Sequence, residues 1–378
     1  MKIIKQTLAA AVMTACLSSL SYAGYFTSDR AGTTAAQFLR LGIGARPVAM
    51  GETFAGIADD INSVYWNPAG LNNISSREVS AMHAVWFEDI SFSWLAYAQE
   101  QFGGTMGVAF NYLTVGKMES YDNQNNRLSG YDAYDFAGVI SYAREIKGIP
   151  AGVNLKVLNS RIEDETAFGA ALDIGAFKVL PVSEGRNITA GISVQNIGPA
   201  YKFINEADPL PLNIKMGAAT THFSDALLVG LDINFPVDNT PNMSVGAEYA
   251  IDLGKFLIFP RAGFKTATID DLDALSGLSA GIGFEYNSIA FDYAWVPYWE
   301  FGDTHRVSAG YKFGRASYPR EPGAVRLTRD ERLYQRGLRQ LERENYLEAV
   351  ELFTEALIIN PEHPGALESL DEAHKGLQ

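Results

Sequence analysis

The feature that most restricts the fold of this chain is a strict alternation of apolar and other side chains, sustained over long segments. In 227–235 one parity is wholly apolar and consists of Leu227, Val229, Leu231, Ile233 and Phe235. The segments 243–252 and 278–287 repeat the pattern. A period of two indicates strands with one apolar and one polar face. Runs of about ten residues exceed the usual strand length of about 5–6, but they suit a tilted strand that crosses a bilayer, which needs about 9–11.

About fourteen such segments follow one another along the chain, an even number, as expected of a bacterial barrel whose two ends lie on the same side. They are 77–87, 91–101, 104–115, 132–144, 149–159, 167–179, 187–197, 211–222, 225–235, 242–252, 256–266, 277–287, 288–298 and 304–313. The sequence therefore predicts an all-β transmembrane β-barrel of about 14 antiparallel strands, over residues 77–314.

The connections between these segments fall into two classes. Tight turns occur at 101–104, 223–225, 252–255 and 286–288, and long polar loops at 116–131, 197–211, 266–276 and 297–304. Short turns on the periplasmic rim and long loops on the outer rim are typical of outer-membrane barrels. The first hairpin, 87–91, departs from this rule because it is short although it lies on the long-loop rim.

A secreted β-sandwich or β-solenoid would also alternate in this way. Aromatic residues at the ends of the segments favour the barrel, because aromatic side chains gather at membrane interfaces. They are Trp86, Phe87, Tyr112, Tyr249, Trp295, Tyr298, Trp299 and Tyr311. The last strand also ends on an aromatic residue, Phe313.

The first 23 residues have the pattern of a secretory signal peptide. Lys2 and Lys5 precede a short apolar run, and small residues stand at the −3 and −1 positions of a cleavage site after Ala23. Cys16 lies in a loose lipoprotein box, so lipidation is the alternative to ordinary cleavage. It is the only cysteine of the chain, which leaves the mature protein with no disulfide framework and no thiolate metal site.

The charge of the chain argues against a nucleic-acid partner. Removal of Lys2 and Lys5 takes the formal net charge from −14 to −16, whereas phosphate binding needs a basic surface. The strand residues that alternate with the apolar ones include five acids and six bases, which would line the lumen. They are Lys156, Asp173, Lys215, Asp232, Glu248, Arg261, Lys265, Glu285, Asp292, Arg306 and Lys312. An ion-selective porin would concentrate one sign, so the mixture favours internal salt bridges or a plugged barrel.

Residues 24–76 precede the first strand and are rich in Ala and Gly. Short helical stretches are expected around 33–41 and 46–58. Asn67 is expected to cap a turn of helix that Pro68 begins, since an Asn side chain accepts from the first backbone N–H groups and Pro fixes φ. This segment is predicted to be a compact hatch inside the barrel.

The stretch LGIGARPVAMGETFAGIADDINSVYWNPAGL, from Leu41 to Leu71, resembles the N-terminal signature of the PorV/PorQ family, which is related to FadL-type transporters of long-chain fatty acids. Positions 59, 60 and 65–70 match that signature as they stand. The resemblance implies a signal peptide, a hatch and a fourteen-stranded outer-membrane barrel. It also implies that some hatch residues gate the lumen or contact a ligand, namely Arg46, Asp59, Asp60, Tyr65, Trp66, Asn67 and Pro68. A purely structural role of these residues is the competing interpretation.

Two functions follow from this resemblance. PorV-type barrels act with the type IX secretion system and bind the signal domain of its cargo, so the first is an interaction and transport component of protein export. The alternative is a FadL-like transporter of long-chain fatty acids or other hydrophobic compounds. The expected partners are accordingly outer-membrane lipid, a periplasmic or secretion-machinery protein, and a hydrophobic small molecule.

The C-terminal part has a different pattern. After a linker at 315–326 that contains Pro and Gly, residues 327–378 have the spacing of a tetratricopeptide-like repeat. Gly337, Tyr346, Ala349, Phe353, Ala356 and Pro361 are expected to pack or end its helices, and Leu333 and Gln340 are expected to face a peptide or another subunit. Because the strand number is even, this helical domain and the hatch entrance are predicted to face the periplasm.

No pattern in the chain indicates an enzyme, a metal site or a cofactor. The five histidines are scattered, without the pairing that a metal site needs, and no GxSxG motif is present. His305 and Ser308 are near each other in one strand, but residues i and i+3 point to opposite faces.

Overall fold

The computed structural model describes residues 26–74, 76–127, 130–182, 186–223, 225–253, 256–269, 272, 274–314, 329–361 and 363–377. The expected signal peptide, with Cys16, and the expected linker at 315–326 lie outside these residues. No helix in this described part is long and apolar enough to cross a membrane.

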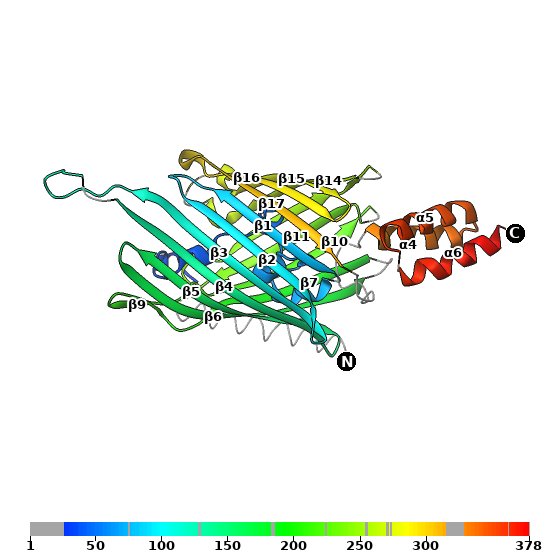
Figure 1. Cartoon of the computed structure of the whole chain (residues 1–378), viewed down its shortest axis with the longest axis horizontal. Helices are drawn as coiled ribbons and strands as arrows, with labels where there is room; N and C mark the ends of the chain where they lie inside the picture. Colours follow the sequence, from blue (N-terminus) through cyan, green and yellow to red (C-terminus); the bar gives the residue numbers. More distant parts are fainter. Residues whose placement is uncertain are drawn as a thin grey trace.

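A closed antiparallel barrel forms the body of the molecule (Figure 1). Its strands are β1 (Arg77–Val85), β2 (Ser91–Gln101), β3 (Gly104–Met118), β4 (Tyr131–Ile146), β5 (Ile149–Ile162), β6 (Glu165–Val182), β7 (Arg186–Ile197), β10 (Asn213–His222), β11 (Leu227–Pro236), β12 (Asn242–Tyr249), β14 (Phe256–Lys265), β15 (Leu278–Tyr286), β16 (Ile289–Pro297) and β17 (Asp303–Phe313). β13 (Ile251–Asp252) continues β12 along β14. β1 pairs with β17 and closes the ring. The prediction of a fourteen-stranded transmembrane barrel is confirmed.

The alternation of the sequence becomes an alternation of burial. Along β1, buried residues alternate with exposed or half-buried ones over its whole length. The outward positions are large and apolar, for example Leu155 at 61 % and Val157 at 64 % exposure on β5. An apolar surface of this extent on a folded chain needs a partner, and lipid supplies it in a transmembrane barrel.

Four neighbouring strands are longer than a bilayer requires. β3 to β6 have 15, 16, 14 and 18 residues, against the roughly 9–11 that span the hydrocarbon. Their far ends project beyond the other strands in Figure 1. Two register shifts interrupt this side of the wall, between Val115 and Met118 in β3 and between Leu172 and Ile174 in β6. A small hairpin of β8 (Tyr201–Phe203) and β9 (Glu206–Asp208) follows β7.

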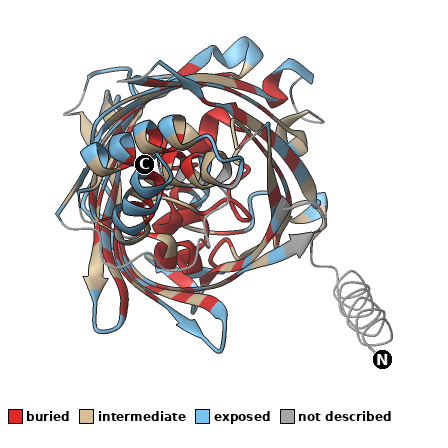
Figure 2. Ribbon diagram, turned by 90° about the vertical axis from the view of Figure 1, so that its right-hand side faces the viewer, coloured by how far each residue is buried: buried red, intermediate tan, exposed pale blue. Residues whose placement is uncertain are grey.

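The hatch, residues 26–74, fills the lumen. Figure 2 looks along the barrel and shows its buried segments inside the ring of strands. It contains η1 (Ser28–Arg30), η2 (Gln37–Arg40), α2 (Ala45–Ala49), α3 (Ser63–Trp66) and η3 (Pro68–Asn73). The helical stretches expected at 33–41 and 46–58 are therefore much shorter than predicted. Phe54, Ile57 and Leu71 of the hatch join Phe92 and Trp94 of β2 in one apolar core.

Small residues on the polar parity of the strands let the hatch approach the wall backbone. A Cβ on Gly263 of β14 would lie 1.9 Å from the backbone nitrogen of Gly51, and one on Gly191 of β7 would lie 1.9 Å from the carbonyl oxygen of Ala55. Real Cβ atoms do not approach so closely, so any larger residue at these positions would push the hatch away.

Three helices form a separate bundle beyond one end of the barrel (Figure 1). They are α4 (Arg329–Glu342), α5 (Tyr346–Ile359) and α6 (Pro364–Gly376). Phe353 is fully buried, and a Cβ on Gly337 would lie 2.4 Å from its ring, so the glycine lets α4 and α5 meet. His363 caps α6 by accepting a hydrogen bond from the backbone N–H of Ala366 at 3.1 Å.

Candidate functional site: the hatch and its contacts with the barrel wall

Asn67 joins three parts of the structure. Its side-chain oxygen accepts from the backbone N–H of Ala69 at 3.2 Å and so caps η3, with Pro68 as the first residue of that helix. Its side-chain nitrogen donates to the carbonyl oxygens of Ala55 in the hatch, at 2.9 Å, and Ala176 in β6, at 3.2 Å. Asn67 therefore ends one turn of the hatch and ties it to the wall.

Tyr65 and Trp66 are anchors of the hatch interior. The Tyr65 hydroxyl donates to the Leu39 carbonyl at 3.0 Å, and the Trp66 indole N–H donates to the Ile43 carbonyl at 2.9 Å. Burial raises the pKa of Tyr65, so its hydroxyl stays protonated. The Lys215 ammonium lies 4.8 Å from the centre of the Trp66 ring. Both aromatic side chains hold loop backbone in place, and each uses its one polar hydrogen for that.

Arg46 is the centre of a buried charge network. Its guanidinium contacts Asp59 at 2.6 Å and Asp60 at 2.7 Å, and its Nε reaches Glu248 of β12 at 2.9 Å. Glu248 in turn accepts from Arg261 of β14 at 2.6 Å. The network thus runs from the Asp59-Asp60 pair of the hatch into the barrel wall.

The charges of this network set each other's protonation. Burial disfavours a charged guanidinium, but the carboxylates of Asp59, Glu248 and Asp60 more than offset it and raise the pKa of Arg46 well above its usual value. Burial raises the pKa of Asp59, and Arg46 opposes this shift only in part. We call the contact of Arg46 with Asp59, Asp60 and Glu248 the arginine latch.

Wall residues also bind hatch backbone. One oxygen of Asp232 accepts from the backbone N–H groups of both Phe54 and Ala55 at 2.9 Å. Lys215 donates to the Glu52 carbonyl at 2.8 Å. Further wall-to-hatch hydrogen bonds come from Asn154, Thr189, Gln195, Ser279 and Ser308. The hatch is therefore held by polar contacts on many strands.

The eleven charged residues assigned to the lumen have several kinds of partner. Lys156 pairs with Asp173 at 2.7 Å, Lys215 with Asp232 at 3.5 Å, and Arg261 with Asp292 at 2.5 Å, in addition to Glu248. Lys312, the most exposed of these cations, lies 3.7 Å from Glu78. Glu285 is half-buried on β15. Arg306 is buried without a carboxylate at ion-pair distance in the described part of the chain.

Sequence reasoning missed three acidic residues that the structure places at the hatch–wall boundary. Glu52 pairs with Lys265 at 2.7 Å, Glu78 accepts from the backbone N–H of Ile61 at 3.2 Å, and Asp238 binds Arg40 at 2.9 Å. Glu78 has the lumen parity of β1, so the alternation could have found it. Glu52 and Asp238 lie outside the strands, where no period marks a side chain as inward.

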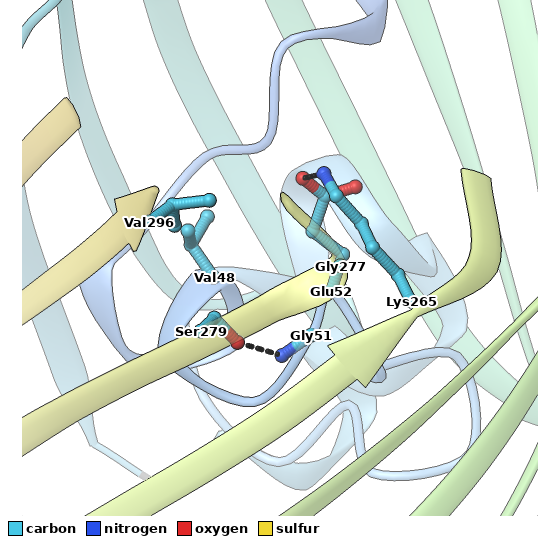
Figure 3. A pocket seen from close by; sticks show the side chains of 7 residues that line it. All are labelled: Val48, Gly51, Glu52, Lys265, Gly277, Ser279 and Val296. Carbon is cyan, nitrogen blue, oxygen red and sulfur yellow. Dashed lines mark hydrogen bonds and ion pairs between the residues drawn. The ribbon is translucent and has the colours of Figure 1, made fainter. Parts of the chain in front are cut away.

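A crevice between hatch and wall lies beside Glu52 (Figure 3). Its empty space of about 160 Å³, part of it open to the solvent, is lined by Val48, Gly51, Glu52, Lys265, Gly277, Ser279 and Val296. Burial alone would raise the pKa of Glu52, but Lys265, with smaller contributions from Lys215 and Arg306, lowers it below its usual value. The crevice has no room for a water molecule, whereas small-molecule sites usually enclose about 300–1,000 Å³, so it cannot take up a long-chain compound in the present conformation.

In the helical bundle, three of the residues expected to pack are fully buried, and one expected at its surface also lies inside. Ala349, Phe353 and Ala356 are fully buried. Leu333, expected to face a peptide or a subunit, is 4 % exposed and packs on Leu352, Ala356 and Ala366. Gln340 is half-buried on α4, Tyr346 begins α5, and Pro361 is exposed after it.

Comparison with known proteins gives a family and a fold. No curated protein matches the chain. The model of a family described as "Uncharacterised protein family (UPF0164)" matches residues 9–231. The toluene transporter TodX of Pseudomonas putida has 11 % sequence identity and a TM-score of 0.50, over 72 % of this chain and 97 % of that one.

Two further structures are similar. A TodX mutant described as a monoaromatic hydrocarbon channel gives a TM-score of 0.51 at 10 % identity, over 73 % of this chain and 99 % of that one. A FadL homologue of Pseudomonas aeruginosa gives 0.44 at 9 % identity, over 72 % and 98 %. At such low identities the similarity to TodX shows a shared barrel fold and nothing beyond it. The match does not extend to the PorV/PorQ name that the hatch signature suggested.

Proposed function

The chain belongs to the uncharacterised protein family UPF0164, and on that premise we propose that it lets small hydrophobic compounds cross the outer membrane. The observation that carries this proposal is the hatch, which fills the barrel with an apolar core and fixes it to the wall through the arginine latch. A lumen closed in this way is unsuited to a water-filled general pore. The fold shared with a toluene transporter supports the same assignment.

Passage needs a movement of the hatch. The crevice beside Glu52 has no room for a water molecule and is far smaller than a typical ligand site, so a solute must widen it or displace part of residues 26–74. The polar contacts between hatch and wall are hydrogen bonds and ion pairs on separate strands. Such contacts can be broken and remade a few at a time, with the barrel itself unchanged. The proposed role is transport, without catalysis.

Uptake by whole cells tests the proposal, because the lipopolysaccharide leaflet of an outer membrane slows hydrophobic solutes. A host that lacks its own channel of this kind would express the full chain, and entry of labelled toluene and of labelled oleate would be compared with entry of maltose. We expect faster entry of at least one hydrophobic solute and unchanged entry of maltose. Equal acceleration of all three solutes would indicate a general porin and would refute the proposal.

A protein partner is a second candidate, and the three-helix bundle favours it. Solenoid repeats need about three units for stability, and this chain has α4, α5 and one further helix. Exposed apolar residues remain on its surface, among them Leu347 at 63 % and Ile358 at 75 %. A role in protein export would have this bundle as its contact site. Cross-linking from residue 347 or 358 in cells, followed by identification of the cross-linked protein, would test it: recovery of secretion machinery is expected, and recovery of no protein would count against it.

A further inference from the structure

Arg306 of β17 is a buried cation without a carboxylate at ion-pair distance in the described part of the chain, and only a longer-range attraction links it to Glu52 of the hatch. Its side chain is 1 % exposed, and it is the bulkiest of the fully buried side chains in the described part of the chain. Its one hydrogen bond there runs from Nη1 to the hydroxyl of Thr304 at 3.0 Å, and Nε finds no acceptor. Burying a charge without a partner is unfavourable, and an arginine cannot relieve this by losing its proton.

The surrounding wall offers no carboxylate to this guanidinium. In the row of inward side chains that contains Arg306, the neighbours on both adjacent strands are alanines, Ala84 of β1 and Ala294 of β16. Asp292, one inward position further along β16, already pairs with Arg261 at 2.5 Å. Other buried wall cations, such as Lys156, have their own acid. Among the buried wall cations that the structure describes, Arg306 is thus the one without a carboxylate at ion-pair distance.

Trp86 supplies a second unpaired donor at the same place. The guanidinium carbon of Arg306 lies 5.3 Å from the centre of a Trp86 ring, a cation–π contact. The indole N–H of Trp86 is buried and also has no acceptor among the described residues. Because Nη1 is engaged by Thr304, Nε and Nη2 form the edge of the guanidinium that can bind a carboxylate through two parallel hydrogen bonds.

We propose that Arg306 and Trp86 form a binding site for the carboxylate of a compact hydrophobic acid that enters the lumen from the rim of the long loops. The carboxylate supplies the acceptor that both donors lack, and the apolar part of the acid packs against aromatic rings. A neutral hydrocarbon would leave the donors unpaired, and an inorganic anion would not use the rings. This proposal rests on the proposed function in one respect, since it gives the transported compounds a chemical class.

We call the cluster of aromatic rings next to Arg306 the aromatic lid, and Trp86 belongs both to this lid and to the site. The lid consists of Trp86 and Phe87 from the β1–β2 connection and of Tyr298 and Phe301 from the β16–β17 connection. The two connections meet through rings whose centres are 5.6 Å apart for Trp86 and Tyr298 and 5.9 Å apart for Phe87 and Phe301. The backbone hydrogen bonds lie within each connection: the N–H of Trp86 donates to the carbonyl of Ile90, and the N–H of Tyr298 donates to the carbonyl of Gly302. The lid can therefore part without loss of a strand.

Equilibrium binding to the detergent-solubilised full chain tests this site separately from transport. The probes are benzoate, benzamide as its uncharged counterpart of similar shape, and inorganic phosphate, each titrated by calorimetry. We expect measurable binding of benzoate and at least about tenfold weaker binding of the other two, because a charge-assisted hydrogen bond contributes on the order of a factor of ten. Equal affinity for benzamide would exclude a carboxylate site, and equal affinity for phosphate would show an anion site without selectivity for hydrophobic acids.

Substitutions assign the binding to these residues. Arg306→Gln should lower the affinity for benzoate at least about tenfold. Arg306→Lys keeps the positive charge but loses the two parallel N–H donors of the guanidinium, and it should lower the affinity less. Trp86→Phe keeps the ring and removes the N–H, so it tests the second donor in a variant that disturbs the fold little. Arg127→Gln, on an exposed loop where Arg127 pairs with Glu119, is the matched control and should bind normally. Unchanged affinity in both Arg306→Gln and Trp86→Phe would overturn the proposal, whether or not the chain transports toluene.

Discussion

At the scale of residues, the site depends on a few buried charges that several strands share. Asp59 and Asp60 stood out in the sequence as adjacent acids, but only the structure shows that Arg46, thirteen positions before Asp59, lies between them and Glu248. The alternation marks a strand residue such as Glu248 as inward. The alternation cannot identify the hatch residue that an inward residue contacts. The hatch sequence has no regular alternation, and the path of its backbone follows the wall.

Removal of Arg46 tests the arginine latch. In Arg46→Gln the carboxylates of Asp59, Asp60 and Glu248 remain buried without their cation, which should cost about 3–5 kcal/mol. The hatch should loosen while the barrel stays assembled, since the strands keep their own ladders. Hydrogen exchange of residues 26–74 should rise strongly, with little change in the strands. Arg46→Lys, which keeps the charge, is the control and should show a smaller rise. Unchanged exchange in Arg46→Gln would show that the latch does not hold the hatch.

The Glu52–Lys265 pair should make the hatch sensitive to acid. The pKa of Glu52 in the folded chain is below its ordinary value of 4.5, so its carboxylate contributes stability above pH 4.5 that is lost as the pH falls through the folded pKa. Hatch exchange in the native chain should therefore increase below about pH 4.5 more than in Glu52→Gln, which has no carboxylate to protonate there. Identical acid profiles for the two proteins would contradict this role of Glu52.

At the scale of elements, the alternation of side chains and the residues that mark the ends of elements predicted the strands well, but they did not predict the helices of the hatch. The ten-residue alternations gave strands such as β2 at its observed bounds, Ser91–Gln101. The expected hatch helix at 46–58 is replaced by the five residues of α2 and by loops. The physical reason is that the wall binds the hatch backbone, as Asp232 does at Phe54 and Ala55, so a helix is not needed to satisfy those N–H groups.

The helical bundle should be an independent folding element. Phe353 is fully buried, against Gly337 of α4 and the ring of Tyr334 at 5.9 Å. Phe353→Ala should cost about 3–5 kcal/mol, which exceeds what so small a bundle can lose. Limited proteolysis of the detergent-solubilised chain should then remove residues after 328 and leave the barrel resistant. The surface substitution Leu347→Ala is the control, and equal resistance of the Phe353→Ala bundle would mean that its core is not its main source of stability.

At the scale of the whole molecule, the outward apolar face, the closed ring of strands and the filled lumen form one arrangement. The alternation predicted the first feature, since Leu155 and Val157 face outward and Lys156 between them faces inward. The even number of strands and the aromatic residues at their ends favoured the second. The filled lumen was suggested by the mixture of charges and by the small residues of 24–76. What parity could not give is the closeness of the packing, in which wall glycines such as Gly263 touch the hatch backbone.

Conductance across a planar bilayer tests most directly the claim that the hatch closes the barrel. The full chain and a variant that lacks residues 26–70 would be reconstituted, after a difference in gel migration between heated and unheated samples has shown that both barrels assemble. The native chain should conduct ions poorly, and the variant should open large and steady channels, because the removed segment fills the lumen with its core and with the arginine latch. Equal conductance of the two assembled barrels would contradict a closing hatch and, with it, the proposed route for hydrophobic compounds.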